Sequence, residues 1–206
     1  MGPGRPVFSI LLVCTGNVCR SAFAQQLGRA YLLEALGAEA AAVRMTSAGT
    51  KAVVGSGMHP DTELVLQGLG GDPDGFRAQQ LRSDLIVEAD LVLAMTRRHR
   101  DAVLGLAPRA LARTFLLQEA VGLMHEGATA DLPDGSTVER ARAWVARLAA
   151  ARGRRPAGRG DDIPDPIGRP LEVHQEVGQA ISDALLRVLA QLAALLEPQG
   201  ARPPPG

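Results

Sequence analysis

The 206-residue sequence has little of several residue types, and each shortage excludes a class of protein. It contains two cysteines, which excludes the dense disulfide framework of small secreted domains. Aromatic residues make up 3% of the chain, so the core must be built from aliphatic side chains. Because the formal net charge is zero, we expect no broad electrostatic field for nucleic acid or for an anionic membrane.

Long hydrophobic runs are also missing. The apolar run of residues 7–13 is far shorter than a bilayer span, and we expect no other segment to cross a membrane. This run is not expected to be a signal peptide, because Val13 before Cys14 is not the small residue that a cleavage site needs. A nucleophilic thiol suits a reducing compartment. We therefore expect a cytoplasmic protein, monomeric or weakly dimeric, with no nucleic-acid or membrane partner.

Apolar β-branched runs alternate with amphipathic segments along most of the chain. We expect strands at residues 7–13, 43–47, 91–95 and 113–116. We expect helices at residues 21–36, 61–69, 83–88, 97–106, 137–151 and 171–196. Strands that alternate with helices form a parallel sheet covered on both faces. The sequence therefore predicts a three-layer α/β fold, with a four-stranded parallel sheet and a phosphate-binding loop after the first strand.

The chain is predicted to be one domain over residues 1–206, with an inserted helix and loop at about 125–160 and a disordered tail at 198–206. Ser136 and Glu139 have the spacing of a capping box at the start of the inserted helix. One interpretation of the insertion is a peripheral helix packed by Trp144. The alternative is a lid, in which Trp144 and the arginines from Arg152 to Arg159 supply an aromatic or positive surface.

The segment Cys14-Thr15-Gly16-Asn17-Val18-Cys19-Arg20-Ser21, here called the phosphate loop, lies between the first strand and the first helix. The backbone N–H groups of such a tight loop converge at the positive end of a helix dipole and stabilise an oxyanion there. Arg20 can add two charge-assisted hydrogen bonds to the same anion. The spacing therefore places the thiolate of Cys14 beneath a bound phosphoryl group, rather than making Cys14 a small buried hydrophobe.

Three neighbours of Cys14 are expected to shape this loop. Gly16 permits a sharp turn, and Asn17 tolerates a left-handed conformation. Ser21 is expected to cap the helix and to offer its hydroxyl to the sulfur.

Catalysis through a phosphocysteine also needs a group that protonates the leaving atom and later activates water. Residues 161–166 contain three aspartates, Asp161, Asp162 and Asp165, and any of them has the right chemistry. Pro166 stiffens the backbone beside Asp165, which helps to hold its carboxyl group in place.

The phosphate loop resembles the signature of the low molecular weight protein tyrosine phosphatase family, which also contains bacterial protein-arginine phosphatases and thioredoxin-coupled arsenate reductases. The resemblance continues in Ser47-Ala48-Gly49, in residues 89–96 and in Asp165-Pro166. It implies that Asp165 is the general acid and base, which leaves Asp161 and Asp162 as solvated loop or turn residues. It also implies that Ser47 hydrogen-bonds Asn17.

The resemblance gives Cys19 two possible roles of equal weight. One is a reversible disulfide with the nucleophile Cys14, and the other is a small residue that fills the base of the loop. The four histidines, His59, His99, His125 and His174, have no metal-ligand spacing, so neither a metal site nor a cofactor is predicted.

Three positions depart from the family pattern and bear on the substrate. Val53 and Ile167 stand where tyrosine phosphatases of the family carry aromatic pocket walls, and neither stacks on a phenol ring. Val18 stands where the arginine phosphatases carry threonine, which disfavours phosphoarginine.

The sequence predicts a phosphomonoester hydrolase with a phosphocysteine intermediate, most consistent with a protein phosphatase acting on a phosphorylated protein. A phosphatase of a small phosphorylated metabolite and a phosphate-binding relative without catalysis stay open as alternatives. Arsenate reduction is disfavoured, because no cysteine follows Cys19 to pass on an oxidising equivalent.

Overall fold

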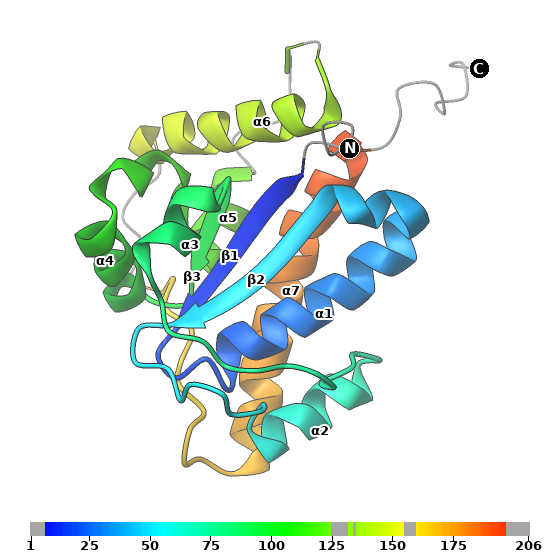
Figure 1. Cartoon of the computed structure of the whole chain (residues 1–206), viewed down its shortest axis with the longest axis vertical. Coiled ribbons are helices and arrows are strands. Elements are labelled where there is room, and N and C mark those ends of the chain that lie inside the picture. The colour runs from blue at the N-terminus through cyan, green and yellow to red at the C-terminus, as the bar shows by residue number, and fades with distance from the viewer. Residues whose placement is uncertain (1–6, 125–131, 134, 155–159, 197–206) are drawn as a thin grey trace.

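A computed structural model of the chain describes residues 7–124, 132–133, 135–154 and 160–196. The predictions for the tail at 198–206, for His125 and for part of the insertion fall outside these residues. Within them the chain forms a parallel sheet with helices on both faces, as predicted (Figure 1).

The four strands lie in the order β2-β1-β3-β4. Their bounds are Phe8–Cys14 for β1, Val43–Gly49 for β2, Leu91–Ala94 for β3 and Thr114–Leu116 for β4. All of β1 is buried, because a central parallel strand is covered on both faces, and this explains its continuous apolar run. Cys14 pairs with Gly49 at the carboxyl ends of β1 and β2, so the phosphate loop leaves the sheet at this edge.

Seven helices surround the sheet in the described residues. Their bounds are Arg20–Leu36 (α1), Pro60–Gly68 (α2), Ser83–Glu88 (α3), Arg97–Leu106 (α4), Leu117–Met124 (α5), Thr137–Ala151 (α6) and Leu171–Leu196 (α7). Every predicted strand and helix is present, with its ends shifted by two residues at most. Helix α5 was not predicted, because it follows β4 directly and no turn residue separates the two.

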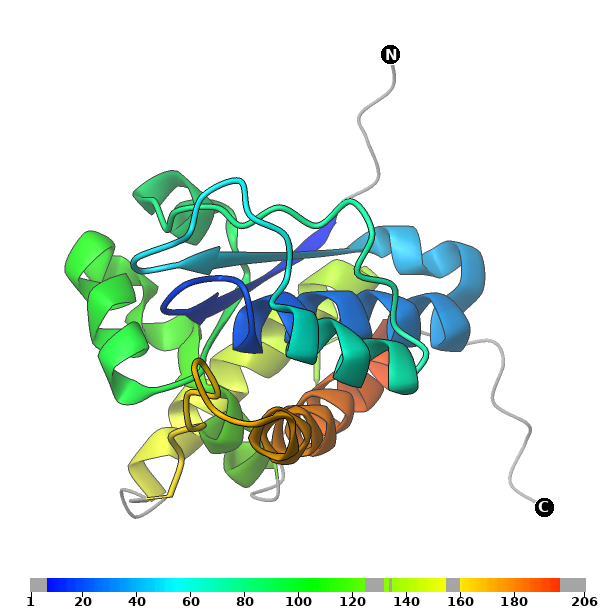
Figure 2. The same ribbon diagram turned by 90° about the horizontal axis from the view of Figure 1, so that it is seen from below.

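The sheet separates two hydrophobic cores of unequal size. Phe8, Ile10 and Leu12 face the larger core, which α1, α5, α6 and α7 complete. Leu11 and Val13 face the smaller core beside α3 and α4. Figure 2 shows α1 and α7 side by side on the same side of the sheet. This packing fixes the start of α1, where the phosphate loop ends.

Helix α7 buries the apolar face predicted for it, including Ile181, Leu185 and Leu192. Its 26 residues and its mean hydropathy of 1.4 also meet the length and composition of a membrane span, the one helix among the described residues that does so. The expectation that no segment crosses a membrane stays a prediction. In this structure 56% of the apolar window is buried, and a long core helix meets the same criteria.

Helix α6 begins at the predicted capping box, in which Glu139 N donates to Ser136 Oγ and Ser136 N donates to the Glu139 carboxylate. Trp144 is fully buried, so it cannot form the aromatic surface of a lid. Arg152 also faces inward, with Nε 2.8 Å from Glu119 Oε1 and its guanidinium 4.4 Å from the centroid of Phe115. For these side chains the lid hypothesis is wrong, and the packed peripheral helix is confirmed.

Candidate active site

The phosphate loop leaves β1 at Cys14 and enters α1 at Arg20. Asn17 takes a left-handed conformation with φ of 56°, as predicted. Gly16 does not have a positive φ, and a Cβ built there would meet Val18 at 3.5 Å, an ordinary contact. The prediction that Gly16 permits the sharp turn is therefore wrong, because Asn17 takes the unusual backbone conformation instead.

The carbonyl groups of the phosphate loop are turned outward by residues 50–59, here called the wall loop. Four wall-loop amides donate to them at 2.8–3.0 Å: Thr50 to Cys14, Lys51 to Thr15, Val53 to Gly16 and His59 to Val18. In a trans peptide the C=O and the N–H point in opposite directions, so the amides that follow these carbonyls face the inside of the loop. The resulting ring of N–H donors suits an oxyanion.

Gly49, at the end of β2, allows the wall loop to approach this closely. A Cβ built on Gly49 would lie 2.4 Å from the carbonyl oxygen of Thr15, and the backbone has no room for it. The sequence analysis did not identify this role, since it depends on a contact between two loops.

The thiol of Cys14 lies inside the loop and is 2% exposed. Its Sγ is 2.9 Å from Ser21 Oγ and accepts from the amide of Asn17 at 3.3 Å. Ser21 Oγ also accepts from Asn17 Nδ2 at 2.9 Å, which leaves its own proton able to donate to the sulfur, the role predicted for it. Ser21 does not cap the helix, contrary to prediction, because α1 begins one residue earlier, with Cys19 at the N-cap position.

The side chain of Asn17 holds the loop to the rest of the fold and is fully buried. Its Nδ2 donates to Ser47 Oγ at 2.8 Å, the bond that the family resemblance implied. Its Oδ1 accepts from the amide of Gln79 at 2.9 Å, and Ser47 Oγ donates onward to Gln25 Oε1 at 2.8 Å. Gln25 and Gln79 could not be identified from the sequence, because neither lies in a recognisable motif.

Arg20 and Asp165 meet at the mouth of the loop. Nη2 of Arg20 lies 2.6 Å from Oδ2 of Asp165, and Nη1 donates to the carbonyl of Ile163 at 3.0 Å. The arginine is 4% exposed and the aspartate 46%, so the buried cation contacts a carboxylate that reaches solvent. Nε of Arg20 is buried without a hydrogen-bond partner among the described residues, and it is a donor available to an anion.

The other two aspartates of this segment differ in burial, and the exposed one, Asp162, also anchors the segment. Asp162 Oδ1 accepts from the amide of Arg97 at 2.8 Å, at the start of α4, and Asp161 is buried. Ile163 N donates to the carbonyl of Met95 at 2.8 Å. The prediction of a solvated loop residue is confirmed for Asp162, which is exposed, and wrong for Asp161, which is buried where the loop passes the carboxyl end of the sheet.

His99 supports the loop from α4 and was not predicted to be part of the site. Its Nε2 lies 2.8 Å from Thr15 Oγ1, and its Nδ1 lies 2.9 Å from Thr96 Oγ1. Burial, together with the positive charge of Arg20, lowers the pKa of His99 to about 4. The ring is therefore neutral at physiological pH and can accept the proton of the Thr15 hydroxyl.

Cys19 lies at the base of the loop and differs chemically from Cys14. Burial raises the pKa of Cys19 to about 11, against the hydrogen bond from Thr62, so it is a thiol at neutral pH. Both cysteines are free, and the disulfide between them stays a prediction. The fold brings His59 and His174 to Cys19, with one ligand atom of each within 4.8 Å of the others. This cluster is tertiary and could not be found from the spacing of the histidines in the sequence, and the absence of a metal site stays a prediction.

The expected pocket walls lie beside the mouth. Val53 and Ile167 are 52% and 50% exposed, and the amide of Ile167 donates to Asp165 Oδ1 at 3.3 Å. Val18 is 9% exposed and belongs to the larger core. The mouth of the site is therefore lined by aliphatic side chains.

The site combines a thiol under a ring of amides with a buried arginine and with a carboxyl group at the mouth that can act as acid and base. These features define a cysteine-dependent phosphatase. Residues 9–142 match the family described as low molecular weight phosphotyrosine protein phosphatase. A protein-arginine-phosphatase of Geobacillus stearothermophilus is 30% identical over 92% of this chain and 97% of its own length. The chain belongs to the low molecular weight phosphotyrosine protein phosphatase family.

Two further comparisons agree with this family. A probable low molecular weight protein-tyrosine-phosphatase of Erwinia amylovora, AmsI, is 35% identical over 52% of this chain and 69% of its own length. The structure of the YwlE arginine phosphatase from Geobacillus stearothermophilus superposes with a TM-score of 0.65 at 29% identity, covering 91% of this chain and 94% of that one. The protein is thus a protein phosphatase whose fold and phosphate loop are those of its family.

Proposed function

We propose that the protein hydrolyses phosphorylated side chains of proteins through a phosphocysteine formed on Cys14. The observation that carries this proposal is the pairing of Arg20 with Asp165 at 2.6 Å, directly above a loop that contains the thiol. The guanidinium that binds the anion and the carboxyl group that transfers the proton therefore lie together at the mouth of the phosphate loop. The loop amides and Arg20 would stabilise the equatorial oxygens of the phosphoryl group as charge develops on them.

In the first step the sulfur of Cys14 attacks phosphorus in line and forms an S–P bond. The bond between phosphorus and the leaving oxygen breaks, and Asp165 gives its proton to that oxygen. The amide of Asn17 donates to the sulfur of Cys14 and the hydroxyl of Ser21 lies 2.9 Å from it, so both groups contact the attacking atom.

In the second step water attacks the phosphocysteine. Asp165, now a carboxylate, takes a proton from the water as its oxygen bonds to phosphorus. The S–P bond breaks, and the electron pair returns to Cys14, where the hydroxyl of Ser21 stabilises the thiolate. The products are inorganic phosphate and the enzyme in its starting state.

We favour phosphotyrosine over phosphoarginine as the substrate. Val53 and Ile167 present apolar walls at the mouth, and Val18 offers no hydroxyl. A phenyl ring gains free energy by contact with such walls, whereas the polar N–H groups of a phosphorylated guanidine lose hydration beside them.

The test compares kcat/KM for a phosphotyrosine peptide and for the same peptide carrying phosphoarginine. The wild-type protein should prefer phosphotyrosine, and Val18→Thr should lower that preference about fivefold, since one new hydrogen bond is worth about 1 kcal/mol. Val54→Thr, on an exposed neighbour of Val53, is the matched control and should change nothing. A wild-type preference for phosphoarginine would contradict this choice of substrate.

The proposal includes a cytoplasmic location and a monomer or weak dimer. The two free cysteines support a reducing compartment. Light scattering across a concentration series tests the oligomeric state, and a stable dimer at micromolar concentration would contradict it.

A further inference from the structure

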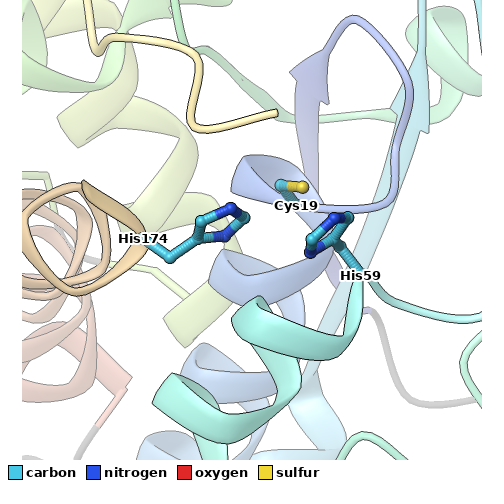
Figure 3. Close-up of side chains that lie close together, drawn as sticks. All are labelled: Cys19, His59 and His174. Atoms are coloured by element: carbon cyan, nitrogen blue, oxygen red, sulfur yellow. The ribbon is translucent and has the colours of Figure 1, made fainter. Parts of the chain in front are cut away.

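Three metal-ligating side chains gather behind the phosphate loop, outside the set of residues that the reaction uses. Cys19 comes from the loop, His59 from the end of the wall loop and His174 from the first turn of α7 (Figure 3). Figure 3 shows the thiol beside two imidazole rings that face each other. The two rings are stacked with centroids 4.8 Å apart, and one ligand atom of each of the three residues lies within 4.8 Å of the others.

A carboxylate completes the group. Oδ2 of Asp61 lies 3.9 Å from Nδ1 of His59 and 3.9 Å from Nε2 of His174. Bond lengths of about 2.0 Å to nitrogen or oxygen and 2.3 Å to sulfur place the ligands of a tetrahedral zinc ion about 3.3–3.8 Å apart. The 3.9 Å distances to Asp61 and the 4.8 Å limit for the other three ligand atoms are longer than this, so the side chains would have to move by about 1 Å or more to enclose one ion.

The two ring nitrogens that face this point lack hydrogen-bond partners. His59 Nδ1 and His174 Nε2 are both buried, and neither finds a partner in the part of the chain that the structure describes. His174 as a whole is 2% exposed. Unpaired buried nitrogens are costly and uncommon, and two that approach the same carboxylate suit a shared cation.

Thr62 orients two of the ligands. Its Oγ1 lies 2.8 Å from Nδ1 of His174, and its hydroxyl hydrogen-bonds Cys19. A hydroxyl that donates to the sulfur accepts from Nδ1–H, which leaves the lone pair of Nε2 for a metal. Metal-binding histidines are commonly held through their second nitrogen in this way.

We propose that Cys19, His59 and His174, with Asp61 as the fourth ligand, bind a zinc ion behind the phosphate loop. One thiolate and one carboxylate balance the charge of a divalent cation, and two neutral imidazoles complete a tetrahedral set. Sulfur and nitrogen ligands favour zinc over magnesium or calcium. Binding releases the thiol proton of Cys19 to solvent.

The ion would join three segments around the active site. Cys19 precedes Arg20, His59 N donates to the carbonyl of Val18, and His174 lies in the first turn of the helix that follows Asp165. Zinc would therefore fix the start of α1, α2 and α7 relative to one another. This inference does not depend on phosphatase activity.

The test uses the full-length protein, freed of metal by dialysis against a chelator. Titration with Co²⁺ should give one ion per chain and the charge-transfer absorption of a cobalt–thiolate bond, and Zn²⁺ should displace the Co²⁺. Zinc at 100 times its dissociation constant should raise the unfolding midpoint by about 5 °C or more.

Variants locate the ion. Cys19→Ser should abolish the cobalt–thiolate band, and His59→Gln and Asp61→Asn should each weaken binding by at least about tenfold. His59 is partly exposed, so its variant stays informative if Cys19→Ser fails to fold. Cys14→Ser and Glu63→Gln, which leave all four ligands in place, are the controls and should keep the band. Absence of stoichiometric binding, or a band lost with Cys14 and kept without Cys19, would overturn the proposal.

Discussion

Nη2 of Arg20 lies 2.6 Å from Oδ2 of Asp165, although the two residues come from opposite ends of the chain. The carboxylate occupies one side of the guanidinium, and the buried Nε remains available to an anion. A phosphoryl group in the loop would take over the arginine as its partner and leave Asp165 next to the leaving atom. The pair thus connects anion binding to proton transfer.

Replacement of the proton donor should have an effect that depends on the leaving group. Asp165→Asn should lower kcat by about 10²–10⁴-fold with phenyl phosphate, because the phenolate then leaves without a proton. The loss with p-nitrophenyl phosphate should be smaller, since nitrophenolate is stable without protonation. Steady-state kinetics with both substrates measure the difference.

Asp162→Asn is the matched control for this prediction. Its carboxylate accepts from the amide of Arg97 and anchors the same segment without contacting Arg20. We expect Asp162→Asn to affect both substrates equally. Equal losses with Asp165→Asn would show that this residue is not the general acid.

The substitution Gly49→Ala should distort the phosphate loop by pushing on the backbone of Thr15. The new Cβ of Gly49→Ala would lie 2.4 Å from the carbonyl oxygen of Thr15, and this backbone would have to move. We expect affinity for inorganic phosphate to fall at least about tenfold, because misplaced amides no longer meet the anion. Isothermal titration calorimetry measures the affinity.

Gly57→Ala provides the comparison in the same wall loop, since a Cβ there meets only Glu63 at 3.8 Å. It should bind phosphate like the wild-type protein. A similar loss of phosphate affinity in both variants would mean that the loss comes from changed flexibility of the wall loop and not from the contact with Thr15.

The buried His99 should make stability depend on pH. Its pKa is about 4 in the folded protein and about 6.5 in the unfolded chain, so between these values only the unfolded chain binds the proton. The contribution of His99 is fully present above pH 6.5. It should fall by about 3 kcal/mol as the pH drops from 6.5 through 4.

Urea unfolding of the wild-type protein and of His99→Gln at several pH values isolates this effect from that of the carboxylates. The variant should lose less stability than the wild type over the same range. Parallel curves would mean that His99 titrates normally in the folded protein.

The insertion should act on stability and not on substrate choice. Trp144 is fully buried in the larger core, so Trp144→Ala should lower the free energy of unfolding by about 3–5 kcal/mol. The ratio of kcat/KM for phosphotyrosine and phosphoarginine peptides should stay unchanged at a temperature where the variant is folded. A shifted ratio would contradict a purely structural role for this side chain.

Contiguous features could be predicted from the sequence, and long-range contacts could not. The phosphate loop lies within eight residues, so the approach of Ser21 to Cys14 and the backbone of Asn17 followed from local chemistry. The strands and helices were predicted because the apolar pattern persists over whole elements. Helix α5 was not predicted, because it follows β4 without a turn between them.

The supporting contacts of the site depend on residues that no local pattern marks. The hydrogen bond between Thr15 and His99 joins segments that only the parallel sheet brings together. The same holds for Gln79 at Asn17 and for the cluster of Cys19, His59 and His174. The burial of Asp161 was not predicted, because the sequence did not show that its loop passes the carboxyl end of the sheet.

The most direct test of the account is chemical trapping of the intermediate. Rapid acid quench of the reaction with a ³²P-labelled phosphotyrosine peptide, followed by peptide mass spectrometry, locates any covalent phosphate. The account predicts label on Cys14 that appears before free phosphate and is absent in Cys14→Ser. Rapid hydrolysis without label on Cys14, or label on another residue, would contradict it.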